Sequence, residues 1–224
     1  MFFILHQLIA DKMKRYILVI LTMTTLWSFG QTFKPDLQDK ALWSTGTRPF
    51  KLIDEQGKKG IYIQDAGGNR VMKLNNFEFG NGVIEFDVKG RNVIGQSFVG
   101  LAFHMQNDST YDCVYFRPFN FTNPDTVRRW RAVQYVYLPQ YDWSRLREEF
   151  PGKYENKVNP VPDPTGWFHC KIVVKGKLVT VFVNNSPTPC LTVTKLNDFS
   201  RGPIGIWADN GSDGSFANLE ITKE

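Results

Sequence analysis

Hydrophobic and polar positions alternate along most of this chain in short runs, and the clearest case is the stretch 98–121. Side chains of an extended strand point alternately to opposite faces. Two alternating runs flank the polar segment 106–110, which predicts two strands joined by a turn. One face of the first strand carries Val99 and Phe103 and is expected to be core, whereas the other face carries His104.

The second strand of this pair has the same two-sided character. Val114 and Phe116 fit the core face, and this leaves Tyr115 and Arg117 on the opposite face. The pattern therefore predicts a sheet with one apolar face and one face that carries polar, aromatic and titratable side chains.

Similar runs recur through the rest of the chain and predict further strands. They cover residues 41–44, 50–53, 60–64, 70–74, 82–89, 131–137, 168–175, 178–184, 190–194, 203–209 and 216–222. Helical periodicity is confined to one or two turns at 143–150. About a dozen short strands in one domain predict an all-β fold, a two-sheet antiparallel jelly-roll sandwich in which one sheet covers the other.

Residues 138–167 depart from the strand pattern. The segment holds five prolines, and its aromatic residues include Tyr141 and Trp143. Loops of this length in compact domains are usually functional or disordered, and aromatic side chains favour an ordered loop because they gain from packing. We therefore expect a packed flap beside the polar face of the sheet.

The N-terminal residues are typical of an export signal. Three basic residues precede the apolar run 16–26, and small residues follow at 28–30. The prediction is a signal peptide at residues 1–30 and a single jelly-roll domain at 31–224, secreted or periplasmic, with no membrane span after cleavage. The alternative is an uncleaved membrane anchor, which the shortness of the apolar run disfavours.

Charge gives no reason to expect a nucleic-acid partner. Removal of residues 1–30 takes away three of the 27 basic and one of the 22 acidic residues, which leaves a nearly balanced domain. Nucleic-acid binding usually needs a concentrated basic face. Arg128, Arg129 and Arg131 do cluster, but Trp130 interrupts them, and the interpretation is a solvated loop edge.

Three cysteines remain in the exported part, so at least one has no partner within the chain. Cys170 shares a strand face with Ile172 and Val174, which favours a small buried hydrophobic residue. A disulfide between Cys170 and Cys190 is the alternative.

Further polar side chains fit faces opposite the core positions of their strands. Alternation places Glu85 and Asp87 there in 82–89, and it places Trp207 and Asp209 there in 203–209. If the strands concerned belong to one sheet, a common surface comprises Glu85, His104, Tyr115, Arg117, Gln134, Trp207 and Asp209.

The chain also resembles a known group of proteins. The motifs are Gly82–Asp87 (GVIEFD), Phe98–Phe103 (FVGLAF), Val114–Asn120 (VYFRPFN), Trp167–His169 (WFH), Val181–Asn184 (VFVN) and Gly202–Trp207 (GPIGIW). They resemble the concanavalin A-like lectin/glucanase superfamily, and within it laminin-G-like domains and the 3-keto-disaccharide hydrolase domain family. The resemblance covers residues 36–222. It implies a jelly roll of two antiparallel sheets, with glycan bound on the concave sheet in many members.

The residue chemistry is compatible with a glycan partner. An aromatic ring packs on the apolar face of a sugar, while planar polar groups bond its hydroxyls. The predicted substrate-binding residues are Tyr115, Gln134, Tyr141, Trp143, Trp207 and Asp209. His104 is expected to reach the ligand, because its neighbours in alternation, Gly100 and Ala102, are small. A hydrogen-bonded structural histidine is the alternative.

Catalysis is a separate expectation, with Glu85, Asp87, His104 and Arg117 as candidates. The alternate spacing of Glu85 and Asp87 is similar to that of the acidic strand of glycoside hydrolase family 16, but Lys89 stands where a third acid is needed. The alternative for this pair is two solvated carboxylates. A lyase or 3-keto-glycoside hydrolase would instead use His104 as base and Arg117 to stabilise oxyanion charge.

No cofactor or metal is expected, and a structural calcium at Asp65, or at Asp209 with Asp213, is the alternative. The sequence predicts an exported domain that binds carbohydrate, with glycoside hydrolase-like processing as a further expectation. A non-catalytic adhesion or protein-interaction module of laminin-G-like type is the alternative function.

Overall fold

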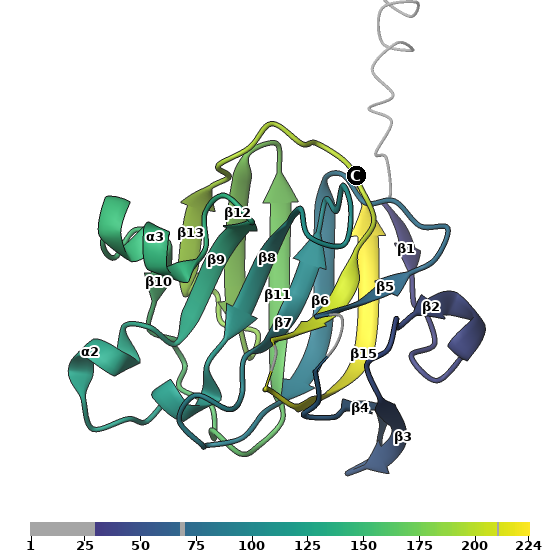
Figure 1. Cartoon of the computed structure of the whole chain (residues 1–224), viewed down its shortest axis with the longest axis horizontal. Coiled ribbons are helices and arrows are strands. Elements are labelled where there is room, and N and C mark those ends of the chain that lie inside the picture. The colour runs from purple at the N-terminus through teal and green to yellow at the C-terminus, as the bar shows by residue number, and fades with distance from the viewer. Residues whose placement is uncertain (1–29, 68–69, 210) are drawn as a thin grey trace, which may run out of the picture.

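The computed structural model describes residues 30–67, 70–209 and 211–224, and Figure 1 shows them as two layers of antiparallel strands. The strands of the first layer are β1 (Gln31–Phe33), β3 (Phe50–Glu55), β4 (Lys58–Ile63), β6 (Gly82–Lys89), β11 (Phe168–Lys175), β12 (Leu178–Val183), β13 (Leu191–Thr194) and β15 (Gly214–Lys223). They form an eight-stranded sheet in the order β13-β12-β11-β6-β15-β4-β3, and β1 pairs with β15.

The second layer is a seven-stranded sheet. Its strands are β2 (Trp43–Ser44), β5 (Val71–Leu74), β7 (Val99–Phe103), β8 (Tyr111–Phe116), β9 (Val133–Leu138), β10 (Glu155–Asn156) and β14 (Gly205–Ala208). Their order is β10-β9-β8-β7-β14-β5-β2, and all the pairs are antiparallel. The all-β sandwich that the alternating runs predict is confirmed.

The core lies between the two sheets and is filled by the inward positions of each strand. Ile84, Phe86 and Val88 of β6 are fully buried, and so are Leu101 and Val114, which pair across β7 and β8. Burial of these side chains supplies the main driving force that holds the layers together. The outward residues of each strand consequently lie on one of two separate outer faces.

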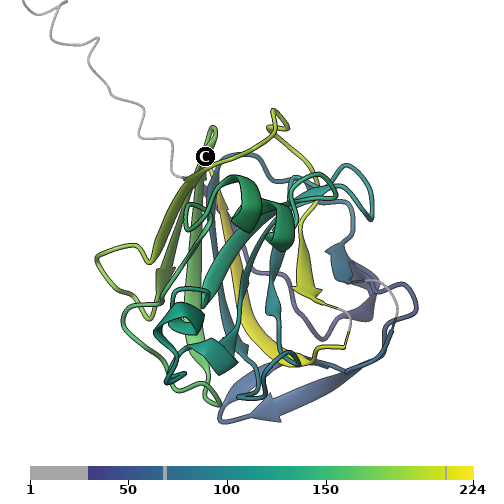
Figure 2. The ribbon, with the colours of Figure 1, turned by 60° about the vertical axis from the view of Figure 1, so that its left-hand side comes forward.

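Helical elements within the described residues are few and short. They are the 3-10 turns η1 (Lys40–Leu42) and η2 (Pro118–Asn120) and the helices α2 (Thr126–Arg129) and α3 (Trp143–Glu149). Figure 2 shows α2 and α3 in front of the sheet that carries β8 and β9. The helical turns predicted at 143–150 correspond to α3, whereas α2, β1 and β10 carry no periodicity that the sequence pattern detects.

The flap at 138–167 is ordered by aromatic contacts. The ring of Phe150 packs against those of Tyr141 and Tyr154 at centroid distances of 6.2 and 5.7 Å, and Tyr154 packs on Tyr135 of β9 at 5.7 Å. Leu146 of α3 is buried at 1% exposure. These side chains anchor the segment to β9.

The predicted signal peptide lies outside the described residues, except for Gly30. Within the described ranges, no helix combines the length and the hydropathy that crossing a bilayer requires. Cys113, Cys170 and Cys190 are free and buried, so Cys170 is a small core residue and is not joined to Cys190 by a disulfide.

Candidate functional site

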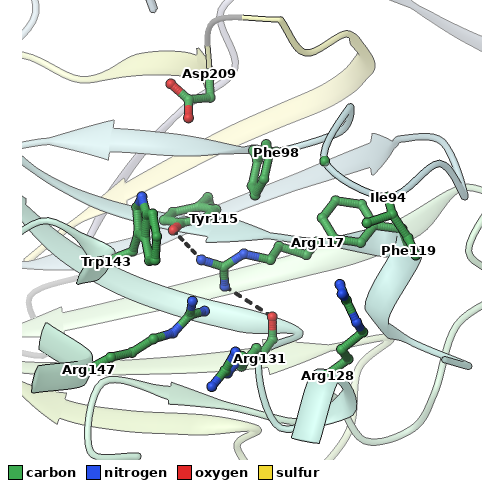
Figure 3. A pocket seen from close by; sticks show the side chains of 11 residues that line it. Ile94, Phe98, Tyr115, Arg117, Phe119, Arg128, Arg131, Trp143, Arg147 and Asp209 are labelled. Atoms are coloured by element: carbon green, nitrogen blue, oxygen red, sulfur yellow. Dashed lines mark hydrogen bonds between the residues drawn. The ribbon is translucent and has the colours of Figure 1, made fainter. Parts of the chain in front are cut away.

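A pocket of about 230 Å³ lies on the outer face of the seven-stranded sheet, where β8 ends (Figure 3). Four arginines, four aromatic residues and one carboxylate contribute to its wall. The lining residues are Ile94, Gly95, Phe98, Tyr115, Arg117, Phe119, Arg128, Arg131, Trp143, Arg147 and Asp209.

Arg117 directly follows β8, and its guanidinium is held by three neighbours. Nη2 donates to the hydroxyl of Tyr115 at 2.6 Å and to Oε1 of Gln134 at 2.5 Å, while Nη1 donates to the carbonyl of Arg131 at 3.0 Å. The residue is only 4% exposed, and this burial lowers the pKa of Arg117. The bonds fix the direction in which the charge is presented.

Tyr115 links this arginine to the rest of the sheet. Its ring lies 4.9 Å from that of Trp207 on β14 and 6.1 Å from that of Phe98. Burial raises the pKa of Tyr115, so the phenol keeps its proton and donates to Oε1 of Gln134 at 3.1 Å. Among the described residues, the Nε2 of Gln134 has no hydrogen-bond partner, although it is buried.

The flap contributes the second half of the pocket. The carboxylate of Asp142 accepts a hydrogen bond from the backbone N–H of Arg145 at 2.9 Å and thereby caps α3. Trp143 and Arg147 lie one turn apart on this helix, and the guanidinium carbon of Arg147 is 4.9 Å from the Trp143 ring centre. Trp143 remains 49% exposed at the rim of the pocket.

Glu155 is the buried carboxylate behind the arginines. It lies on β10 opposite Gln134 of β9, and Arg147 binds it with Nη2–Oε2 2.8 Å and both Nε–Oε distances 3.0 Å. Arg131 approaches its other oxygen at 3.7 Å, and Arg117 lies 3.9 Å from Oε2. One carboxylate thus faces three guanidinium groups.

The structure brings together four of the predicted site residues. Tyr115, Arg117, Trp143 and Asp209 all line the pocket. Asp209 follows β14, and its Oδ1 also pairs with Arg70 Nε at 2.9 Å.

The other predicted binding residues occupy supporting positions. Gln134 and Trp207 are buried beside Tyr115, where they bond or stack with lining residues. Tyr141 is outside the lining. It bridges to Tyr137, and the guanidinium carbon of Arg145 lies 4.4 Å from its ring centre.

The prediction that Glu85 shares a surface with Arg117 is wrong, and Asp87, the second acidic catalytic candidate, lies beside Glu85. Both face outward from β6 as alternation predicts, but β6 belongs to the eight-stranded sheet, on the opposite side of the sandwich from Arg117. There Asp87 accepts from Lys58 at 2.6 Å and pairs with His169 at 2.9 Å. Alternation identifies the outward side chains of a strand but does not say to which sheet the strand belongs.

His104 is also absent from the predicted surface. Its backbone has a φ of 49°, so the strand alternation ends at this residue and its side chain turns into the interior, fully buried. Nε2 lies 2.9 Å from the carbonyl of Gly80, and Nδ1 lies 2.6 Å from Nζ of Lys195. The alternative interpretation, a hydrogen-bonded structural histidine, describes its environment.

The sequence pattern did not predict several of the residues that line the pocket. Arg128 and Arg131 belong to the basic cluster that was interpreted as a solvated loop edge, whereas α2 and the turn after it direct both into the pocket wall. The carboxylate of Asp125 caps this short helix by accepting from the N–H of Val127 at 2.8 Å. Arg147 carried a detectable signal, since it follows Trp143 at helical spacing.

The carboxylates considered for calcium have other partners. Asp213 accepts from Arg91 Nε and from the hydroxyl of Tyr62, both at 2.5 Å, and Asp65 lies 3.7 Å from Arg91. Over the described ranges, no group of three or more His, Cys, Asp or Glu side chains is placed to hold a metal ion.

Solved structures with the same fold include two proteins of Bacillus subtilis. The carbohydrate-binding module CBM66 is 13% identical, with 81% of this chain and 96% of that chain covered at a TM-score of 0.57. A protein of unknown function with a galectin-like fold is 10% identical, with coverage of 87% and 97% and a TM-score of 0.58. A glycosidic hydrolase is 11% identical, with coverage of 86% and 95% and a TM-score of 0.52.

No curated protein matches the chain. A family model does match, and it spans residues 34–222, essentially all of the described domain. The resemblance to the 3-keto-disaccharide hydrolase domain family is therefore confirmed, whereas no match here shows the laminin-G-like resemblance. The chain belongs to the family of 3-keto-alpha-glucoside-1,2-lyase-like domains.

Proposed function

We propose that this chain is an exported domain that binds carbohydrate in the pocket around Arg117. The observation that carries the proposal is the combination in one small pocket of an exposed aromatic rim, Trp143, with the fixed polar groups of Tyr115, Arg117 and Asp209. Trp143 offers an apolar surface to a sugar ring, and the polar groups bond its hydroxyls.

The pocket dimensions suit a short sugar. A volume of about 230 Å³ is below the range of roughly 300–1,000 Å³ that is typical of pockets for drug-sized ligands. One sugar unit is therefore expected inside, with the rest of the glycan extending past Trp143. The likeness in fold to a carbohydrate-binding module supports this use of the sandwich.

The binding site is tested with polysaccharide retention by the full chain and its variants. We expect Trp143→Ala to weaken retention about tenfold, because loss of an aromatic stacking partner removes roughly 1–1.5 kcal/mol. Trp130→Ala is the matched control, since Trp130 is 54% exposed and lies outside the pocket lining. Equal loss in both variants, or in neither, would refute the proposed site.

Sugar release is measured in the same experiment, because the family description names a lyase. In such an elimination a base removes a proton from the carbon between the keto group and the glycosidic carbon, the glycosidic C–O bond breaks as a C=C bond forms, and the released oxygen takes up a proton. A cationic group stabilises the negative charge that develops on the keto oxygen. We assign the first role to Asp209 and the second to Arg117, since both line the pocket. Asp209→Asn is expected to abolish product release and to preserve retention; unchanged release would remove Asp209 from this role.

Export is part of the proposal and rests on the basic, apolar and small residues of the N-terminus. The chain expressed with its own leader is expected in the periplasm or the medium, with Gln31 as its first residue. N-terminal sequencing and cell fractionation check this, and an intact leader on a membrane-bound chain would contradict it.

A further inference from the structure

The charge of the pocket wall is strongly unbalanced. Arg117, Arg128, Arg131 and Arg147 line it, whereas Asp209 is the one acidic residue of the lining among the described residues. An arginine guanidinium stays ionised at any physiological pH, so these four positive charges persist.

The carboxylates nearby do not neutralise this charge. Glu155 is shared by three of the arginines, with nearest distances of 2.8 Å to Arg147, 3.7 Å to Arg131 and 3.9 Å to Arg117. In the part of the chain that the structure describes, the one carboxylate paired with the fourth, Arg128, is that of Asp125, at a long distance of 3.8 Å. Exposed ion pairs of this kind contribute little, so Arg128 remains available to a ligand.

Asp209 is similarly engaged. Its carboxylate pairs with Arg70 at 2.9 Å, so part of its negative charge is directed away from the arginines of the pocket. The wall therefore holds an excess of positive charge around a small, partly desolvated space. In such a space like charges repel strongly, and a bound anion relieves that repulsion.

The arginines are also arranged for geometric recognition. Arg117 is held by Tyr115 and Gln134 before any ligand arrives, so binding costs little side-chain entropy there. The side chains of Arg128 and Arg131 are 45% and 39% exposed and can adjust to the ligand. Guanidinium groups bind carboxylate, sulfate and phosphate oxygens in pairs, which adds orientation to charge.

We propose that the ligand of this pocket is an acidic glycan, whose sugar carries an oxyanion that Arg117, Arg128 and Arg131 hold. The inference rests on the proposed function and deepens it by naming the class of sugar. The sugar ring lies against Trp143 and Tyr115, and its acidic substituent points toward the arginines. A carboxylate of a uronic acid and a sulfate ester share this oxyanion chemistry.

The test compares acidic polysaccharides with their neutral counterparts. Retention of the full chain is measured on polygalacturonate and on its carboxyl-reduced form, and on a sulfated galactan and its desulfated form. We expect acidic forms to be retained about tenfold or more better than neutral ones, with the preference falling as salt rises. The polygalacturonate and sulfated arms distinguish the two sources of the oxyanion.

Variants then locate the recognition. The double substitution Arg128→Gln and Arg131→Gln is expected to remove most of the preference for the acidic form, because retention of the acidic form should fall several times more than retention of the neutral form. Arg201→Gln is the control for charge, since Arg201 is 74% exposed and lies outside the pocket lining.

Each outcome has a definite meaning. Equal retention of acidic and neutral forms overturns the acidic preference and leaves the proposed carbohydrate function in place. An acidic preference that the pocket double variant retains, or that Arg201→Gln lowers equally, assigns it to general surface charge and also overturns the inference. Absence of retention on all four polysaccharides and across a broad glycan panel defeats the proposed function itself.

Discussion

The guanidinium carbon of Arg117 lies 4.8 Å from the ring centre of Tyr115, and its Nη2 donates to the hydroxyl of the same tyrosine at 2.6 Å. The two residues are one alternation apart at the end of β8, so the strand itself sets their spacing. Stacking and hydrogen bonding together immobilise the charge that the pocket presents.

Lysine at position 117 is expected to be unable to replace the guanidinium group of Arg117. Arg117→Lys keeps a positive charge but cannot bond Tyr115, Gln134 and the Arg131 carbonyl at once. We expect the free energy of unfolding to fall by about 1–3 kcal/mol, because buried acceptors lose their donor. Urea unfolding measures this; Arg128→Lys, at an exposed position, is the control and should stay within about 0.5 kcal/mol. Equal midpoints would contradict the prediction.

A substitution at His104 should affect stability and leave the pocket intact. His104→Ala removes both ring contacts from the interior and places alanine at a φ of 49°, so we expect a loss of about 1–3 kcal/mol. His104→Asn should lose less, since asparagine tolerates that backbone region. Glycan retention by the folded protein should equal that of the wild type. A selective loss of retention or turnover would restore His104 to the site.

Lys195 is predicted to stabilise the buried polar cluster that it forms with His104 and Asp112. Its Nζ lies 3.1 Å from Oδ2 of Asp112, and both side chains are buried between the sheets. Lys195→Met leaves Asp112 without its cation, which typically costs about 3–5 kcal/mol. Adding Asp112→Asn should recover part of the loss, and a double-mutant cycle in urea measures the coupling. Strictly additive effects would show that the two residues act independently.

Asp87 should make the fold sensitive to acid. Burial alone would raise the pKa of Asp87, but hydrogen bonds from His169, Lys58 and Asn218 outweigh burial and lower it from 3.8 to about 2. Because the pKa of Asp87 is lower in the folded protein than in the unfolded chain, the ionised carboxylate stabilises the fold by about 2 kcal/mol. This stabilisation is present in full above about pH 4 and is lost as the pH falls toward 2.

The measurement is the free energy of unfolding of wild type and Asp87→Asn between pH 6 and pH 2. The difference between the two proteins should shrink as the pH falls. Asp54→Asn, at an exposed position of β3, is the control for removal of a carboxylate. A difference that stays constant with pH would rule out Asp87 as the titrating group.

Gly100 should tolerate no side chain, because β7 and β8 approach closely at the pocket. A Cβ there would lie 2.1 Å from the carbonyl oxygen of Val114 and 2.7 Å from the Cβ of Tyr115. Gly100→Ala is therefore expected to cost roughly 1–3 kcal/mol and to displace Tyr115, with weaker glycan retention. Gly67→Ala, which meets nothing within 4 Å, is the control. Thermal unfolding compares them, and equal midpoints would contradict the close approach.

Most of the fold was predictable because strand side chains alternate with a period of two. The runs at 82–89 and 168–175 reproduce the bounds of β6 and β11. Short elements such as α2 and β10 were not predictable, since four or two residues show no period. Their positions depend instead on local capping by Asp125 and on pairing with β9.

The fold class, the family, the flap and the outward direction of Tyr115, Arg117 and Asp209 could all be predicted from the sequence. All of these follow from local alternation, composition and motifs. The tertiary structure was needed to establish which outward faces coincide. It separated Glu85 and Asp87 from Arg117, because a two-sheet sandwich has two outer faces and sheet membership depends on long-range pairing. The positive φ of His104, 49°, directs this side chain into the interior, and the alternation pattern does not reveal that angle.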